Sequence, residues 1–153
     1  MVLELRTSFL ATLKIFVAAP VEIGSTVDGI RRIIPITGGT VDGPGLTGKV
    51  LAGGADFQLL KSDTLTELEA KYAIETDSGE RIYVDNIGLR SGSQQDIARL
   101  VRGEAVNPKR IYFRCTPRLH SSAEKWSWLS SRIFIGSGER YKDAVHIDLF
   151  VVD

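Results

Sequence analysis

The chain has one cysteine, one methionine and two histidines among 153 residues, and its nineteen basic side chains balance nineteen acidic ones. A single cysteine excludes an intrachain disulfide and is typical of a reducing compartment, so we expect a cytoplasmic protein. A balanced charge provides no concentrated positive field, which argues against nucleic acid or an anionic membrane as a partner. Isolated histidines and a lone thiol predict no metal site.

Long apolar runs are also absent. The most apolar stretch, Phe9–Pro20, is interrupted by Lys14 and has no basic leader, whereas a membrane-spanning helix needs about 20 apolar residues. We therefore predict no transmembrane segment and no signal peptide, and the length predicts one domain over residues 1–153.

Three catalytic signatures are missing as well. The chain has no Gly-x-Ser-x-Gly elbow, no phosphate loop ending in Gly-Lys-Ser/Thr and no dinucleotide fingerprint. These absences argue against a serine hydrolase, a nucleotide-phosphate site and a tightly bound nicotinamide. We expect any activity to need no cofactor.

Apolar and polar side chains alternate over most of the chain, with the period of two that is typical of half-buried β-strands. The longest alternating run covers residues 3–17. The clearest pair of runs, Leu68–Thr76 and Glu80–Arg90, flanks the turn Asp77–Gly79 and predicts a β-hairpin. Further strands are predicted at Arg31–Thr37, Gly48–Leu51, Asp56–Leu60, Arg110–Pro117, Ser131–Gly136 and Val145–Val152.

One segment, Ser93–Arg102, has helical character. Ser93 can cap its start and Gly103 can end it, and an apolar stripe lies between them. Many strands, short turns and one short helix predict an all-β fold, an antiparallel meander that closes into a single β-barrel. Closure is favoured because it removes exposed strand edges. A two-sheet sandwich is the alternative.

Glycines are concentrated between Gly38 and Gly54, where they indicate tight turns and close backbone approach. Asp56 follows this run and begins an apolar strand. Its carboxyl group is our first candidate for a general acid that faces a cavity with a pKa raised by desolvation. The structural alternative is a turn carboxylate that accepts backbone hydrogen bonds. Asp42 is better explained as ordinary Asp-Gly turn chemistry.

Five segments form an ordered set that covers nearly the whole chain: Arg32–Leu60, Tyr72–Gly79, Ile82–Arg90, Tyr112–Arg118 and Trp128–Arg140. With these segments the sequence resembles the β-barrel family called domain of unknown function 3237, or UPF0311. One departure is Ser130, where the family usually has Asn.

The resemblance implies a single barrel with an internal cavity and no obligate cofactor. The biochemical role of the family is mostly undefined. Some fungal members belong to aromatic polyketide pathways, in which a ring-closing, hydroalkoxylation-type activity has been proposed. For this chain the resemblance therefore implies an aromatic or polyketide-like substrate in secondary metabolism.

Arginines and a second acid extend the candidate set. Arg114 and Arg32 are candidates for orienting a phenolate or carboxylate, Arg114 in a catalytic role and Arg32 in substrate binding. Strand parity places Arg114 on the polar face of Arg110–Pro117, and it stays open which face lines the barrel. Glu75 is the second candidate acid after Asp56.

Four more residues are predicted to bind substrate. Asn86 and Arg90 continue an apolar strand face, which indicates the mouth or floor of a cavity or, alternatively, a structural hydrogen-bond network. Tyr72 lies in the predicted hairpin. Trp128 shares a face with Trp126 if the segment is extended, as in an aromatic wall for a flat ligand, although core packing is the commoner use.

Two functions remain open at this point. The first is a cofactor-free enzyme that binds a small molecule in the barrel and catalyses an acid–base isomerisation or cyclisation. The second is a carrier or sensor with the same cavity and no chemistry. A cavity-facing carboxyl group with a raised pKa discriminates between them, because a carrier does not need one. A side-chain-filled scaffold is a third interpretation, and homo-oligomerisation stays open.

Overall fold

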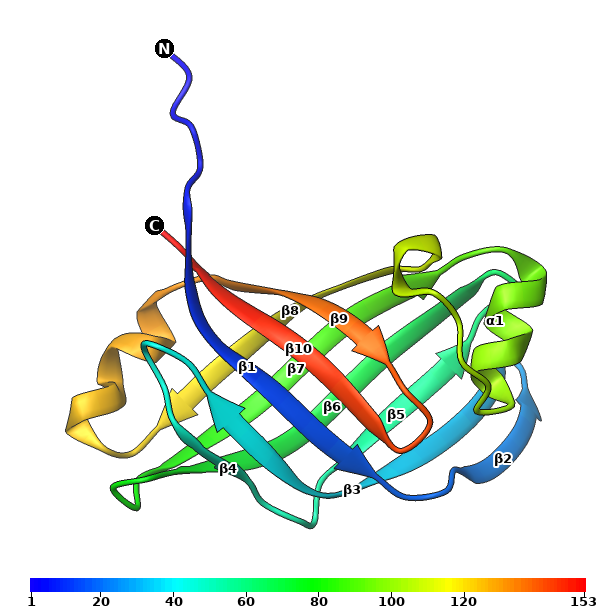
Figure 1. The fold of residues 1–153 in the computed structure, drawn as a ribbon, viewed down its shortest axis with the longest axis horizontal. Helices are drawn as coiled ribbons and strands as arrows, with labels where there is room; N and C mark the ends of the chain where they lie inside the picture. Colours follow the sequence, from blue (N-terminus) through cyan, green and yellow to red (C-terminus); the bar gives the residue numbers. More distant parts are fainter.

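A computed structural model describes all residues 1–153 as a closed antiparallel β-barrel, which confirms the barrel rather than the sandwich (Figure 1). Eight strand positions surround the barrel, because β4 and β5 together fill one position between β3 and β6, and β1 and β2 together fill the position on the other side of β3. The strands are β1 (Thr7–Val17), β2 (Val21–Thr26), β3 (Gly29–Asp42), β4 (Gly48–Val50), β5 (Ala55–Leu60), β6 (Leu65–Thr76), β7 (Arg81–Ser91), β8 (Tyr112–Ser121), β9 (Phe134–Arg140) and β10 (Ala144–Val152).

Pairing of β1 with two distant strands closes the barrel. On one side β1 pairs with β10 from Thr7 opposite Val152 onward. On the other side it pairs with the end of β3, from Thr12 opposite Asp42. The first strand thus joins the last one to the glycine-rich part of β3.

The N-terminal strand begins later than the alternation predicts. Residues 1–6 lie outside any strand and project from the barrel (Figure 1). The register of β1 also shifts between Phe9 and Ala11, so Leu10 and Ala11 are both buried whereas Phe9 is exposed. A β-bulge of this kind breaks a strict period of two. Strand β2 was not predicted from the sequence.

The predicted hairpin is confirmed as β6 and β7, which pair from Leu65 opposite Ser91 to Glu75 opposite Arg81. Gly79 takes a φ of +93° in the turn, and its N–H donates to the Thr76 carbonyl over 2.9 Å. That backbone conformation is one that L side chains rarely adopt.

We expect Gly79→Val to lower the free energy of unfolding by about 1 kcal/mol or more, because valine is forced into the left-handed region. Thermal unfolding of the variant measures the loss. Ser78→Ala, in the same exposed turn, is the control and is expected to leave the melting temperature nearly unchanged. Equal melting temperatures for Gly79→Val and the wild type would contradict this turn geometry.

The glycine run allows strands to approach more closely than side chains permit. A Cβ on Gly39 would lie 2.2 Å from the Lys14 carbonyl oxygen, and one on Gly54 would lie 2.3 Å from the Lys71 carbonyl oxygen. These contacts are far below normal van der Waals separation. The run therefore forms the corner where β3, β4 and β5 share the barrel wall with β1 and β6.

The two ends of the barrel differ in chemistry. At one end the 3-10 helix η2 (Glu124–Ser131) packs Trp126 and Leu129 against the apolar core, beside Phe134. The tryptophans therefore lie on a helix rather than on an extended segment, and their ring centroids are 6.5 Å apart. The shared face was expected only for an extended segment, and that condition is not met, because this segment is helical.

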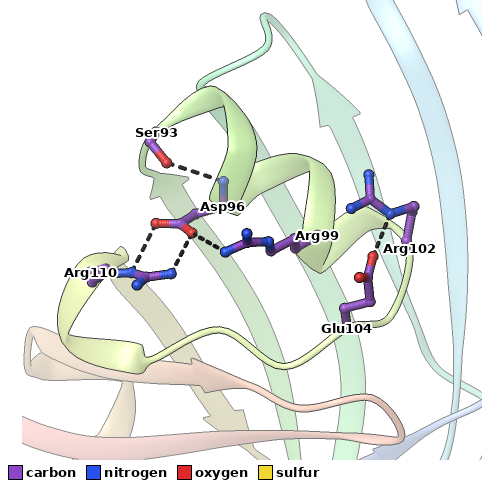
Figure 2. Close-up of polar contacts among 6 residues, drawn as sticks. All are labelled: Ser93, Asp96, Arg99, Arg102, Glu104 and Arg110. Carbon is purple, nitrogen blue, oxygen red and sulfur yellow. Dashed lines mark hydrogen bonds and ion pairs between the residues drawn. The ribbon is translucent and has the colours of Figure 1, made fainter.

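Helix α1 (Gln94–Val101) lies at the opposite end. It confirms the predicted helical segment, with Ser93 as its N-cap and Gly103 at a φ of +80° just after it. Asp96 is buried and receives two hydrogen bonds from Arg110, from Nε to Oδ2 over 3.1 Å and from Nη2 to Oδ1 over 2.6 Å (Figure 2). This bidentate pair ties α1 to the short 3-10 helix η1 (Pro108–Arg110) that precedes β8.

No helix in the structure has the length and apolar character needed to cross a membrane.

Candidate functional site

A small cavity of about 40 Å³ lies inside the barrel, and all eight strand positions contribute to its lining. Eleven of the seventeen lining residues are hydrophobic, with Tyr72 and Cys115 counted among them, so its few polar groups stand out. A volume of this size holds a few water molecules. The polar lining residues are Asp56, Gln58, Tyr72, Asn86, Arg90 and Arg140, together with the thiol of Cys115.

Asp56 lies on β5, opposite Ile34 of β3 and Ala70 of β6, so the sheet on both sides fixes its backbone. Gln58 Nε2 donates to Asp56 Oδ2 over 2.9 Å, whereas the buried Oδ1 has no hydrogen-bond partner. Burial raises the pKa of Asp56 above its usual value, although the Gln58 bond and the charge of Arg90 act to lower it. The carboxyl group is therefore suited to holding a proton inside the barrel.

Two arginines face the same cavity. Arg90, near the end of β7, is 3% exposed, and its Nε is buried without a partner. Burial lowers the pKa of Arg90 to about 10, so the guanidinium stays charged at neutral pH. Arg140 ends β9, where its Nη1 donates to the carbonyl oxygens of Tyr141 and Ala144. Burial lowers the pKa of Arg140 too, while the charge of Asp56 opposes the shift.

Arg32 is buried next to this pair but serves a different purpose. Its Nε donates to Glu22 Oε1 over 2.9 Å, and its Nη2 donates to the Val101 carbonyl oxygen over 3.3 Å. Arg32 therefore links β3, β2 and the last residue of α1. It closes the α1 end of the barrel rather than lining the cavity.

Tyr72, Asn86 and Cys115 complete the polar lining. Burial raises the pKa of Tyr72, so its hydroxyl stays neutral and can donate a hydrogen bond. Burial also raises the pKa of the Cys115 thiol, which disfavours a thiolate nucleophile. Asn86 Oδ1 is buried without a partner.

Four of the six buried side-chain polar atoms without a hydrogen-bond partner belong to residues that line this one cavity; the other two are on Thr66 and Asp85. The four are three acceptors, Asp56 Oδ1, Gln58 Oε1 and Asn86 Oδ1, and one donor, Arg90 Nε. Buried polar groups are normally hydrogen-bonded, and leaving one unpaired costs about 1–3 kcal/mol. Four such atoms around one space are typical of a site that is completed by a bound molecule.

Three sequence candidates lie away from the cavity. Glu75 points outward and pairs with Lys49 and Arg81. Arg114 is exposed on the outer face of β8, where its guanidinium lies 5.4 Å from the centre of the Tyr112 ring.

Trp128 is 37% exposed at the η2 end, and its ring centroid lies 6.0 Å from that of Phe134. The structure therefore brings together Asp56, Tyr72, Asn86 and Arg90, with Arg32 next to them. It does not bring Glu75, Arg114 or Trp128 to this group.

Two lining residues, Gln58 and Arg140, were missed by sequence reasoning. Gln58 has the strand parity of Asp56, so its inward direction was available from the alternation. Arg140 shares its face with Gly136 and Gly138, and a Cβ on Gly138 would lie 2.7 Å from the Phe113 ring. Glycines opposite a large aromatic residue were the signal that this strand face points inward.

No group of three His, Cys, Asp or Glu side chains in the structure is arranged to hold a metal ion. The cavity itself offers one carboxylate and one thiol as metal-ligating groups.

A family model described as "Protein of unknown function (DUF3237)" matches residues 5–152. The chain belongs to the DUF3237/UPF0311 family. A UPF0311 protein of Rhodopseudomonas palustris is 45% identical over 148 residues, which cover 97% of each chain. The resemblance in the five segments above is thereby confirmed over nearly the full length.

Solved structures show the same fold. The crystal structure of a conserved protein of unknown function from R. palustris matches with a TM-score of 0.93 at 43% identity, and it covers all of both chains. An enzyme from Penicillium herquei matches with a TM-score of 0.74 at 18% identity, over 100% of this chain and 98% of the other. At that identity the likeness to the fungal enzyme shows a shared barrel.

Proposed function

We propose that this DUF3237 barrel is a cofactor-free acid–base enzyme that isomerises or cyclises a small unsaturated molecule, aromatic or polyketide-like in character. The observation that carries this proposal is Asp56. Its Oδ1 is buried, unpartnered and at the cavity, and burial raises its pKa. The fungal enzyme on the same fold supports an enzymatic role at the level of architecture.

The chemistry follows from a protonated Asp56 whose Oδ2 is held by Gln58. Asp56 donates its proton to one carbon of a carbon–carbon double bond, and a cation forms at the other carbon. A hydroxyl oxygen of the same molecule attacks that cation and closes a ring, and its proton returns to the Asp56 carboxylate. No atom is gained or lost overall. Apolar walls exclude water, which would otherwise capture the cation.

Substrate entry requires the barrel to open, because a cavity of about 40 Å³ is smaller than a flat ring system. An engineered apolar cavity that binds benzene measures about 150 Å³. The α1 end is the natural place for opening. It is closed by a small cluster of Ile97, Leu100 and Val106 and by the Arg32 bond to Val101, whereas the η2 end is filled by the main core.

The test is solvent deuterium incorporation. Native mass spectrometry of freshly purified protein identifies a carried ligand, and a panel of prenylated phenols and unsaturated acids supplies further substrates. In D2O, Asp56 carries a deuteron, so each turnover places one deuterium on a product carbon. We expect labelled product with the wild type and with Asp42→Asn, an exposed carboxylate of the glycine run. Asp56→Asn is expected to form labelled product about a hundredfold more slowly, or slower still.

Two outcomes contradict the proposal. Labelling by Asp56→Asn at the wild-type rate would assign the proton transfer to another group. A ligand that binds stoichiometrically, exchanges no proton with Asp56 and is recovered unchanged and without deuterium would instead show that the protein is a carrier.

A further inference from the structure

We infer that the molecule bound in this cavity carries a carboxylate, which lies between Arg90 and Arg140 while Asp56 faces the reacting carbon. This inference deepens the proposed function by naming the charge and the anchoring group of its substrate. It is carried by the arrangement of cationic and anionic groups around the cavity.

The first step is the charge balance of the lining. Arg90 and Arg140 contribute two positive charges, and Asp56 is the only acid among the lining residues. Neither arginine forms an ion pair with it: Arg90 has no ion-pair partner, and Arg140 Nη1 bonds to backbone carbonyl oxygens. Because a buried charge is costly unless it is paired, the site lacks at least one negative charge.

The second step compares Arg90 with Arg32, its buried neighbour. Arg32 is 5% exposed and fully engaged, with Glu22 on one side and the Val101 carbonyl on the other. Arg90 is 3% exposed, forms no ion pair, and has the Phe113 ring 5.6 Å from its central carbon. The fold therefore supplies an ion pair for one buried arginine, whereas the other interacts with the charge of Asp56 without forming an ion pair.

The third step selects the anion. Arginine binds carboxylates through two parallel N–H···O bonds, and a carboxylate is ionised throughout the neutral range. A phenol, with an ordinary pKa near 10, is neutral there and would leave the site uncompensated. The unpartnered acceptors Gln58 Oε1 and Asn86 Oδ1 add a preference for a hydroxyl donor elsewhere on the same molecule.

Binding of matched probes tests this without any turnover assay. Isothermal titration and thermal shift are measured with acetate against acetamide and with benzoate against benzamide and phenol. We expect at least one carboxylate to bind about tenfold or more tightly than its uncharged amide, which corresponds to a charge-assisted hydrogen bond. Arg90→Met and Arg140→Met are expected to abolish this preference.

Arg114→Met, a surface arginine, is the matched control and is expected to keep it. Where Arg90→Met does not fold, the wild-type comparison and Arg90→Lys, which keeps charge but not the planar fork, decide the question. Equal affinity of carboxylates and amides, or stronger binding of phenol than of benzoate, would overturn the inference.

This test and the deuterium test fail separately. If labelling is strongly slowed in Asp56→Asn but carboxylates are not preferred over amides, the acid–base function is supported and the inference of a carboxylate on the ligand is contradicted. A carboxylate preference with unlabelled, unchanged ligand would leave an anion carrier.

Discussion

Asp56→Asn is expected to lower turnover by about a hundredfold or more, which is the usual contribution of general acid catalysis, and at the same time to stabilise the fold at neutral pH. Both effects have one cause. The carboxyl group is buried with one oxygen unpartnered, so its charged form is costly in the folded state. Asparagine keeps the size and the oxygen that accepts from Gln58 but cannot ionise.

The sign follows from the raised pKa of Asp56. Below the unfolded value of about 4, the carboxyl group is neutral in both states and costs nothing. As the pH rises from there through the folded pKa, only the unfolded chain releases the proton freely, so stability is lost. As the pH is raised from acidic to neutral, the melting temperature of the wild type should therefore fall relative to that of Asp56→Asn.

Asp42→Asn is the control and should follow the wild-type profile, since that side chain is exposed. A lower melting temperature of Asp56→Asn at every pH would show that Asp56 is a structural turn residue. Unchanged turnover would remove Asp56 from the mechanism.

Gly54→Ala is expected to destabilise the barrel by about 3 kcal/mol, at the upper end of what an inserted methyl group costs in a packed interior. A Cβ at Gly54 would lie 2.3 Å from the Lys71 carbonyl oxygen and 2.5 Å from the Tyr72 Cβ. Both contacts belong to a neighbouring strand that cannot move without breaking its ladder. Chemical denaturation measures the change in the free energy of unfolding.

The adjacent Gly53→Ala is the matched control. A Cβ there meets nothing within 4 Å, so its cost comes only from a φ of +109°, about 1 kcal/mol for a residue forced into that region. Similar losses for the two variants would mean that β5 can move away from β6, and would contradict a rigid glycine corner. Because Tyr72 lines the cavity, Gly54→Ala should also weaken ligand binding.

Local signals predicted much of the architecture. The hairpin of β6 and β7 and the helix α1 follow from alternation, turn residues and capping, which act within a few residues. Asp56 was found by its position between the glycine run and an apolar strand, and Arg90 by its position on an apolar strand face. The bulge at Phe9 and the 3-10 helix η2 were missed, because tertiary packing rather than local preference decides them.

Arg114 and Arg140 show why the site was harder to predict than the fold. Strand parity shows which side chains share a face but not which face points into the barrel. When polar side chains line the interior, the usual contrast between an apolar inner face and a polar outer face is lost. Arg114 was favoured by family resemblance and lies outside, whereas Arg140 was unremarked and lies inside. Pairing with strands that are far away in the sequence decides which face points inward, so the sequence of one segment alone does not predict it.

The pairing of β1 with β10 governs how this chain must fold as it is made. Ser8 and Asp153 are hydrogen-bonded partners separated by 145 residues, and β1 has its full set of neighbours only after β10 has been synthesised. Contacts of such long range slow folding, because the chain must lose loop entropy before the pairing is gained. During translation the nascent sheet therefore exposes one unpaired edge along β1. Chaperone binding and aggregation are competing processes at such an edge.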